Sequence, residues 1–347
     1  MADIDELRAD TSKPAASADG AVHHRKISVV VPCYNEAENV IPMHDAITEQ
    51  FAKALRGYDY DIIFIDNCST DGTRDKLRLL CAQDERTRVI LNSRNFGQFN
   101  SPFYGMCQAD GDAVITICCD FQDPVDLIPK FVHAWEEGHT VVSAIKTNSD
   151  EGKVLRLLRT CYYKLIRKMS DVSQIEHFTG TGLYDQRFIQ VLKDLDDPQP
   201  FLRGIVAELG PANRKDIPYR QALRRAGKTH NSFTTLYDAA MLSFTSYTKV
   251  PLRLATIGGF VVSAITLLLA VVFLVLKLLN WNQYAAGMAP LVILVLLIGS
   301  TQTFFIGLLG EYVLTINSRT MKRPLVVEEE RLNWPADRPR KGEGPCE

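Results

Sequence analysis

Over the first 250 residues, short runs of β-branched and aliphatic residues alternate with longer segments whose apolar positions repeat at helical spacing. The runs that predict strands are 27–32, 61–65, 88–91, 113–118 and 140–144. Segments 36–55, 98–109 and 125–137 predict helices, and Asp71-Gly72 opens another. This alternation predicts an α/β fold with a mostly parallel sheet covered on both faces, in which ligands bind at the carboxyl ends of the strands.

The last third of the chain has a different pattern, because residues 254–276 and 278–310 carry no charged side chain. A helix rises about 1.5 Å per residue and needs about 20 apolar residues to cross a membrane core of about 30 Å. We therefore predict two transmembrane helices, 252–279 and 288–309. A buried helical hairpin is the alternative, but it would normally show a charged face, and these runs have none.

The distribution of cations predicts the orientation. Cationic side chains flank the outer ends of the two spans, whereas the only cation near their inner ends is Lys277. We therefore expect a two-span protein of the inner (cytoplasmic) membrane, with its α/β domain and both termini in the cytoplasm, and reduced cysteines. The expected parts are a disordered tail at 1–26, the α/β domain at 27–230, a juxtamembrane segment at 231–251, the two spans, and a cytoplasmic C-terminal tail at 310–347.

Composition and charge indicate which classes of molecule this protein binds. The 39 Lys and Arg residues against 41 Asp and Glu residues give a net charge of -2, so we expect no nucleic-acid partner. A hydrophobic content of 46% excludes a mainly disordered chain. Segment 153–168 mixes Lys and Arg with apolar residues and has no acid, which predicts a basic amphipathic helix on an anionic membrane surface. A core-packed helix with an exposed cationic face is the alternative.

Polar segments follow three of the predicted strands, at 32–36, 66–72 and 119–124. Each one taken alone could be a helix cap or a turn. Three at one edge of a parallel sheet indicate a binding site.

These segments, in their order along the chain, resemble the successive motifs of glycosyltransferase family 2. The motifs are Val31-Pro32-Cys33-Tyr34-Asn35-Glu36, Asp66-Asn67-Cys68-Ser69-Thr70-Asp71-Gly72-Thr73, Ser93-Arg94-Asn95-Phe96-Gly97, Gly111-Asp112 and Asp120-Phe121-Gln122-Asp123-Pro124. Within that family, residues 27–324 resemble the membrane-anchored polyprenyl-phosphate glycosyltransferases, such as bactoprenol glucosyltransferases and dolichol-phosphate mannose synthases. The resemblance implies a Rossmann-like GT-A domain followed by two transmembrane helices, in a membrane protein able to form a homo-oligomer.

The resemblance also implies a nucleotide-sugar donor. Pro32, Tyr34 and Glu36 are expected near its ribose and base, and Asp66 on the base itself. An ionised Asp accepts a hydrogen bond from uracil N3-H, which favours a UDP-sugar. Asn67 stands where the family often has a second acidic residue, and this departure leaves the identity of the base open. The other donor-binding residues implied are Asn95, Gln122, Arg225 and Lys228.

The family's metal motif is Asp-x-Asp, and the matching positions here are Cys118, Cys119 and Asp120. Mg2+ or Mn2+ takes oxygen ligands, often one or two carboxylates together with substrate phosphates. We therefore expect Asp120 to hold the metal with the donor diphosphate, with Gln122 or Asp123 nearby. Cys118 is interpreted as the buried end of a strand.

The implied reaction is inverting transfer of one sugar to polyprenyl phosphate. A phosphate monoester is largely dianionic at pH 7, so it needs no strong general base. The catalytic residues implied are Asp120, Asp123 and Arg203, and Arg203 and His230 are expected at the acceptor phosphate. Gly182 stands where many relatives carry Arg, so a different lipid acceptor, such as a diacylglycerol-type lipid or a lipid-diphosphate saccharide, stays open. A third hypothesis is a catalytically weak membrane scaffold, motivated by Cys118.

Overall fold

The structure is a computed structural model in which the sheet domain and the C-terminal helix are described. The described ranges are 25–148, 175–222, 224–225, 288–321 and 323–334, with isolated residues between 241 and 279. The predicted N-terminal tail up to residue 24, the basic helix at 153–168, Lys228 and His230 lie outside them. So does nearly all of the juxtamembrane segment and of the first predicted span.

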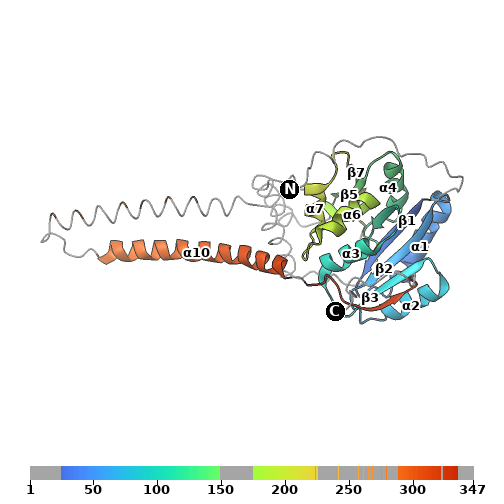
Figure 1. The fold of residues 1–347 in the computed structure, drawn as a ribbon, viewed down its shortest axis with the longest axis horizontal. Coiled ribbons are helices and arrows are strands. Elements are labelled where there is room, and N and C mark those ends of the chain that lie inside the picture. The colour runs from blue at the N-terminus through green and yellow to red at the C-terminus, as the bar shows by residue number, and fades with distance from the viewer. Residues whose placement is uncertain are drawn as a thin grey trace, which may run out of the picture.

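An eight-stranded mixed sheet forms the centre of the α/β domain (Figure 1), in the order β7-β5-β6-β4-β1-β2-β3-β8. The strands are β1 (Lys26–Cys33), β2 (Asp59–Asp66), β3 (Thr87–Asn92), β4 (Ala113–Thr116), β5 (Val141–Asn148), β6 (Phe178–Asp185), β7 (Lys215–Arg220) and β8 (Glu328–Leu332). Strands β4, β1, β2 and β3 pair in parallel, as does β5 with β7. Strand β6 is antiparallel to β4 and β5, and β8 is antiparallel to β3. The expected mostly parallel sheet is confirmed.

Helices cover both faces of this sheet. One face packs against α1 (Val40–Ala54), α2 (Thr73–Gln83) and α4 (Leu127–Glu136). The other packs against α3 (Gly97–Gln108), α6 (Gln186–Leu195) and α7 (Leu202–Leu209).

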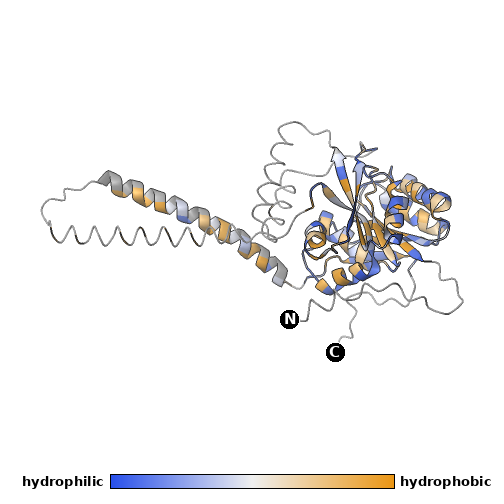
Figure 2. Ribbon diagram, turned by 90° about the horizontal axis from the view of Figure 1, so that it is seen from above, coloured by the Kyte–Doolittle hydropathy of each residue, from blue (hydrophilic) through white to orange (hydrophobic). Residues whose placement is uncertain are grey.

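The sequence of β1 shows how one strand serves both cores. Val29 and Val31 lie in the core under α1, whereas Val30 lies in the core under α3. Successive strand side chains point to opposite faces, so a continuous apolar run is required wherever both faces are covered. Figure 2 shows these apolar strands enclosed between the helices.

The C-terminal part of the chain leaves the domain and returns to it. Helix α10 (Met288–Thr320) extends away from the α/β domain in both views (Figures 1 and 2), and β8 then joins the sheet beside β3. The second predicted span, 288–309, falls within α10. Among the residues that the structure describes, no helix meets the length and hydropathy required of a membrane span.

Strand β8 was not expected from the sequence, which indicated a tail from residue 310 onward. Its residues pair from Val89↔Leu332 to Asn92↔Glu328. Trp334 packs on the core beneath α3, and its indole N-H donates to Val89 O at 3.3 Å. The sheet domain therefore includes residues far beyond 230.

Candidate active site at the carboxyl edge of the sheet

The carboxyl ends of β4, β1 and β2 are neighbours, so the loops that follow them share one edge of the sheet. Cys33 at the end of β1 lies opposite Asp66 at the end of β2, and the N-H of Asn67 donates to Cys33 O at 2.9 Å. On the other side of β1, the N-H of Ile117 donates to Val30 O at 3.1 Å. The predicted donor-binding residues after β1 and β2 and the predicted metal-binding residue after β4 are therefore brought together.

The loops after β1 and β2 hold each other in place. The backbone N-H of Asn35 donates to Ser69 Oγ at 2.8 Å, and that of Glu36 donates to Thr73 Oγ1 at 2.9 Å. In return, Asn35 Oδ1 accepts from the N-H of Thr70 at 2.8 Å. The side chains of Asn35, Ser69 and Thr73 thus hold the two loops together. Pro32, near the end of β1, and Tyr34, the first residue after it, are both half-buried.

Glu36 is buried in this edge and is bound from two sides. Its Oε2 accepts from Asn39 Nδ2 at 2.6 Å, and its Oε1 pairs with Arg224. Burial raises the pKa of Glu36, while Asn39 and Arg224 oppose that rise. Sequence analysis did not single out Arg224; its position next to Arg225 was the available signal.

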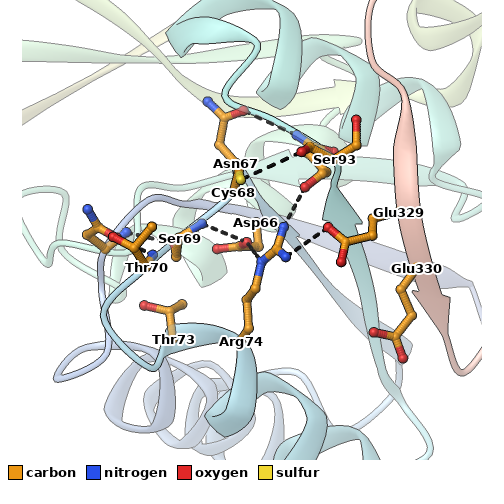
Figure 3. A network of polar contacts seen from close by, with 12 residues as sticks. Asp66, Asn67, Cys68, Ser69, Thr70, Thr73, Arg74, Ser93, Glu329 and Glu330 are labelled. Carbon is orange, nitrogen blue, oxygen red and sulfur yellow. Dashed lines mark hydrogen bonds and ion pairs between the residues drawn. The ribbon is translucent and has the colours of Figure 1, made fainter.

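Asp66 is fully buried at the end of β2 (Figure 3). Its Oδ2 accepts from the N-H of Ser69 at 3.0 Å and from Arg74 Nε at 2.9 Å. Its Oδ1 is buried without a hydrogen-bond partner among the described residues. An unpaired buried acceptor is costly, so this oxygen marks a place where a ligand donor would be favourable. Arg74 was also not identified from the sequence.

Asn67 explains one departure from the family pattern. Its Nδ2 donates to Asn95 Oδ1 at 2.9 Å and to Gly97 O at 3.1 Å, and its Oδ1 accepts from the N-H of Phe96 at 2.8 Å. A carboxylate could not make the two donor contacts. Asn67 and Asn95 therefore hold the loop between β3 and α3, and Asn95 reaches the edge as part of that loop.

The loop after β4 carries the matched metal motif. Cys119 is buried, whereas Cys118 is exposed, so the interpretation of Cys118 as a buried strand end was wrong. The reason is that β4 ends at Thr116, and Cys118 already belongs to the following loop. Asp120 is half-buried, and its Oδ1 accepts from the N-H of Gln122 at 3.1 Å.

Two residues that follow β7, Ala222 and Arg225, contact this loop. The N-H of Ala222 donates to Gln122 O at 3.0 Å, and the guanidinium of Arg225 stands 5.2 Å from the ring centre of Phe121. Arg225 and Gln122 are therefore at the predicted edge together with Asp120. Arg224 and Arg225 place positive charge near the carboxylates of Glu36 and Asp120.

Asp123 is buried, and hydroxyl groups engage both of its carboxylate oxygens. Thr181 on β6 donates to Oδ2, and Tyr219 on β7 donates to Oδ1. Burial and the neighbouring Asp123 raise the pKa of Tyr219, which therefore remains a phenol that can donate. Asp123 thus ties the β4 loop to two strands, and its catalytic role stays a prediction.

Gly182, beside Thr181 on β6, lies so close to β5 that a Cβ at this position would stand 2.2 Å from Val142 O. That separation is far below contact distance, and the neighbouring atom belongs to the backbone of a paired strand. The backbone here therefore admits no side chain at position 182.

Arg203 lies on α7 with its side chain exposed, and its Nε donates to Thr179 O at 3.3 Å. Thr179 belongs to β6, the strand that also carries the Thr181 contact to Asp123. The structure therefore connects Arg203 to the strand next to the β4 loop.

A divalent cation fits the electrostatics of this edge. Burial raises the pKa of Asp120, and the nearby Asp123 also raises it, while the N-H of Gln122 and the charge of Arg224 lower it. Over the described residues, no group of three or more His, Cys, Asp and Glu side chains could hold a metal ion. Mg2+ in nucleotide sites often takes one or two protein carboxylates, with phosphates and water completing the shell, so Asp120 alone fits that use.

The family model that matches this chain is described as glycosyl transferase family 2 and covers residues 28–191. The prophage bactoprenol glucosyl transferase homolog of Escherichia coli (strain K12) is 31% identical over 301 residues, which cover 86% of this chain and 97% of that protein. The bactoprenol glucosyl transferase of Shigella phage SfV is 30% identical over 308 residues, covering 88% of this chain and 99% of that protein.

Among solved structures, glucosyl-3-phosphoglycerate synthase from Mycobacterium tuberculosis, in complex with Mn2+, uridine diphosphate and phosphoglyceric acid, matches with a TM-score of 0.43. It is 17% identical, and the match covers 64% of this chain and 76% of that chain.

A mostly parallel α/β sheet with acidic and amide side chains gathered at its carboxyl edge is an architecture that binds ligands at its strand ends, and it agrees with the expected Rossmann-like GT-A fold. The two relatives match this chain over nearly their whole lengths at about 30% identity. The chain belongs to glycosyl transferase family 2 and is an enzyme of that family.

Proposed function

We propose that this enzyme transfers a single sugar, with inversion, from a UDP-sugar to polyprenyl phosphate at the cytoplasmic face of a membrane. The observation that carries the proposal is the juxtaposition of buried Asp66, with one unpartnered oxygen, and Asp120 along one edge of the sheet. One carboxylate suits the base of the donor and the other suits its diphosphate. One of the two relatives is named a bactoprenol glucosyl transferase and the other a homolog of one, and these names support a lipid acceptor.

The proposed donor site follows the order of the loops. Asp66 Oδ1 accepts uracil N3-H, and a base that lacks a donor at this position would leave the buried oxygen unpaired. Pro32, Tyr34 and Glu36 line the ribose and base. The remaining proposed donor contacts are Asn95, Gln122, Arg225 and Lys228.

At the diphosphate, Asp120 would hold Mg2+ or Mn2+, which would stabilise the negative charge that develops on the departing UDP. Arg225 adds a fixed positive charge beside the Asp120 loop. Such preorganised charge is the main contribution required, because UDP takes the electron pair of the broken bond to the sugar and departs as an anion.

At the acceptor, we assign Arg203 and His230 to the phosphate of the lipid. A dianionic phosphate oxygen attacks without a strong general base. The geometry of Asp123 supports this acceptor over a hydroxyl, since both of its oxygens already accept hydroxyl hydrogens from within the protein. A carboxylate in that state is poorly placed to take a proton from an acceptor alcohol, so our proposal gives Asp123 a structural role in place of the catalytic role expected from the resemblance.

Anchoring in the membrane is part of the proposal. The uncharged runs 254–276 and 278–310 support two spans with cytoplasmic termini, and the composition of 153–168 supports contact with anionic lipid. Homo-oligomer formation belongs to the same proposal.

A second candidate acceptor has one observation in its favour. The backbone at Gly182 admits no side chain, so the Arg found in many relatives has no counterpart at this position. A glycolipid or lipid-diphosphate saccharide acceptor therefore remains the alternative to polyprenyl phosphate.

The test of the proposed function uses the full chain purified in detergent with Mg2+ or Mn2+, polyprenyl phosphate and a panel of UDP-, GDP- and CMP-sugars. We expect release of UDP and a lipid monophosphate heavier by one sugar, both abolished in Asp120→Asn. Release of GDP or CMP instead would refute the assignment of the base. Nucleotide release that never depends on polyprenyl phosphate would refute the acceptor.

A further inference from the structure

Arg74 connects the proposed base-reading carboxylate to two other elements (Figure 3). It is the second residue of α2 and its side chain is 17% exposed. Its Nε donates to Asp66 Oδ2 at 2.9 Å, its Nη2 donates to Asn92 O at 2.5 Å, and its Nη1 donates to Glu329 Oε2 at 2.9 Å. All three guanidinium nitrogens are therefore engaged in hydrogen bonds.

Glu329 is supplied by β8, which follows α10 and lies 255 residues beyond Arg74 in the chain. Strand β8 is held on the sheet independently of this contact, by pairing with β3 and by two donations from Asn333 Nδ2, to Cys81 O at 2.7 Å and to Thr87 O at 2.9 Å. The C-terminal strand thus places a carboxylate at a fixed position on the far side of Arg74.

The carboxylate of Asp66 needs such support because it is fully buried and must present one oxygen to a ligand. Ser69 and Arg74 both bind Oδ2, which leaves Oδ1 as the available acceptor. Arg can fix a carboxylate in this way because its planar fork sets direction as well as charge, which a Lys ammonium does not.

We propose that Arg74 and Glu329 are positioning residues for Asp66, so that the C-terminal strand β8 helps determine how tightly and how selectively the enzyme binds the uracil of its donor. This inference rests on the proposed function, because it assumes that Asp66 accepts a hydrogen bond from the base. Arg74 and Glu329 act through Asp66 and touch neither substrate.

The same strand supplies a matched control. Glu330 pairs with Arg78, also on α2, through Nη2 at 2.7 Å and Nε at 3.1 Å. Among the described residues, neither Glu330 nor Arg78 forms a hydrogen bond or an ion pair with Asp66, and Arg78 otherwise pairs with Asp75. Glu329→Gln and Glu330→Gln therefore remove the same charge from neighbouring positions of β8, and one of them alone alters the support of Asp66.

The experiment measures binding of UDP and of 3-methyl-UDP, which lacks the N3-H donor, to the full-length protein in detergent. Glu329 is 50% exposed, and loss of an exposed ion pair corresponds to roughly two- to fivefold, so Glu329→Gln should weaken UDP binding by about threefold. Arg74→Lys should weaken it by about tenfold or more, because it removes a directed bond to a buried carboxylate. In both variants, 3-methyl-UDP should bind with nearly the affinity that it has for the wild type. Glu330→Gln should leave the affinities for UDP and for 3-methyl-UDP unchanged.

The ratio of the two affinities separates positioning from general loss of structure. A variant that merely loosens the domain would weaken both nucleotides alike, and that result would refute the inference. Unchanged UDP binding in Glu329→Gln would also refute it, even if Arg74→Lys does not fold. A wild-type protein that fails to discriminate UDP from 3-methyl-UDP would instead refute the base assignment in the proposed function.

Discussion

Substitution of Asp123 tests whether the acceptor needs a general base. Its carboxylate is 2% exposed and receives one hydroxyl hydrogen bond on each oxygen, from Thr181 and from Tyr219. Asp123→Asn keeps the size of the side chain and one acceptor oxygen but replaces the other oxygen with an amide donor. The variant therefore weakens the link between the β4 loop and strands β6 and β7 without emptying the space.

The expected cost follows from these contacts. A hydrogen bond to a charged group contributes about 1.5–3 kcal/mol, and the variant loses the charge from both bonds while one hydroxyl must also reverse its direction. We expect a loss of about 2 kcal/mol in the free energy of unfolding. For a domain of this size that corresponds to a fall of roughly 4–8 °C in the unfolding midpoint.

The assay combines thermal unfolding with turnover measured well below the midpoints of all variants. Because a phosphate acceptor needs no general base, Asp123→Asn should retain turnover within about tenfold of the wild type. Tyr219→Phe should lower the midpoint by a similar amount. Asp126→Asn is the control, since Asp126 lies just beyond the same loop, is 62% exposed and should change neither quantity.

The opposite pattern would contradict this reasoning. General base catalysis contributes about a hundredfold to ten-thousandfold. An Asp123→Asn variant with an unchanged midpoint and turnover reduced by a hundredfold or more would identify Asp123 as a base and the acceptor as a hydroxyl.

Asp120→Asn should abolish metal-dependent turnover while nucleotide binding persists, and near-normal rates would contradict the metal assignment. Burial raises the pKa of Asp120, and only the ionised carboxylate binds the metal. As the pH is lowered, kcat/KM should therefore begin to fall at a higher pH than it would for a solvent-exposed Asp. A pH profile that stays flat down to about pH 4 would contradict this expectation. Arg203→Ala should raise the KM for the lipid more than the KM for the donor, and the reverse would move Arg203 to the diphosphate. Gly182→Ala should destabilise the domain by about 3 kcal/mol through the clash with Val142 O, and an unchanged unfolding midpoint would contradict it.

The centre of the fold could be predicted because its pattern is local. The apolar run of β1 requires burial on both faces, and this requirement alone indicates a covered parallel strand. The gathering of the loops after β1, β2 and β4 followed from the same argument, since the carboxyl ends of neighbouring parallel strands meet at one edge.

Strand β8 could not be predicted because its residues, Glu328-Glu-Glu-Arg-Leu332, have no strand-like alternation of apolar residues. An edge strand is stabilised by its backbone pairing and by side chains of its partner elements, here Arg74, Arg78 and Tyr104. Those partners lie more than 200 residues earlier in the chain, so no local pattern connects them.

The partners of long cationic side chains and the close contacts of the backbone also could not be predicted from the sequence. Arg74 and Arg224 find their carboxylate partners only after the fold is formed, and a sequence shows nothing of where such side chains end. Gly182 illustrates the converse, because its meaning depends on the separation of β6 from Val142 O. The sequence shows the glycine, whereas the close approach to Val142 O exists only in the folded sheet.

The acceptor is the central claim, and one comparison tests it most directly. The purified enzyme is given the nucleotide-sugar that it turns over and, in separate reactions, polyprenyl phosphate, the corresponding polyprenol and a diacylglycerol, with each lipid product weighed by mass spectrometry. We predict that polyprenyl phosphate alone gains one sugar, with one UDP released for each lipid modified. A sugar added to the polyprenol or the diacylglycerol, with polyprenyl phosphate unchanged, would contradict the account.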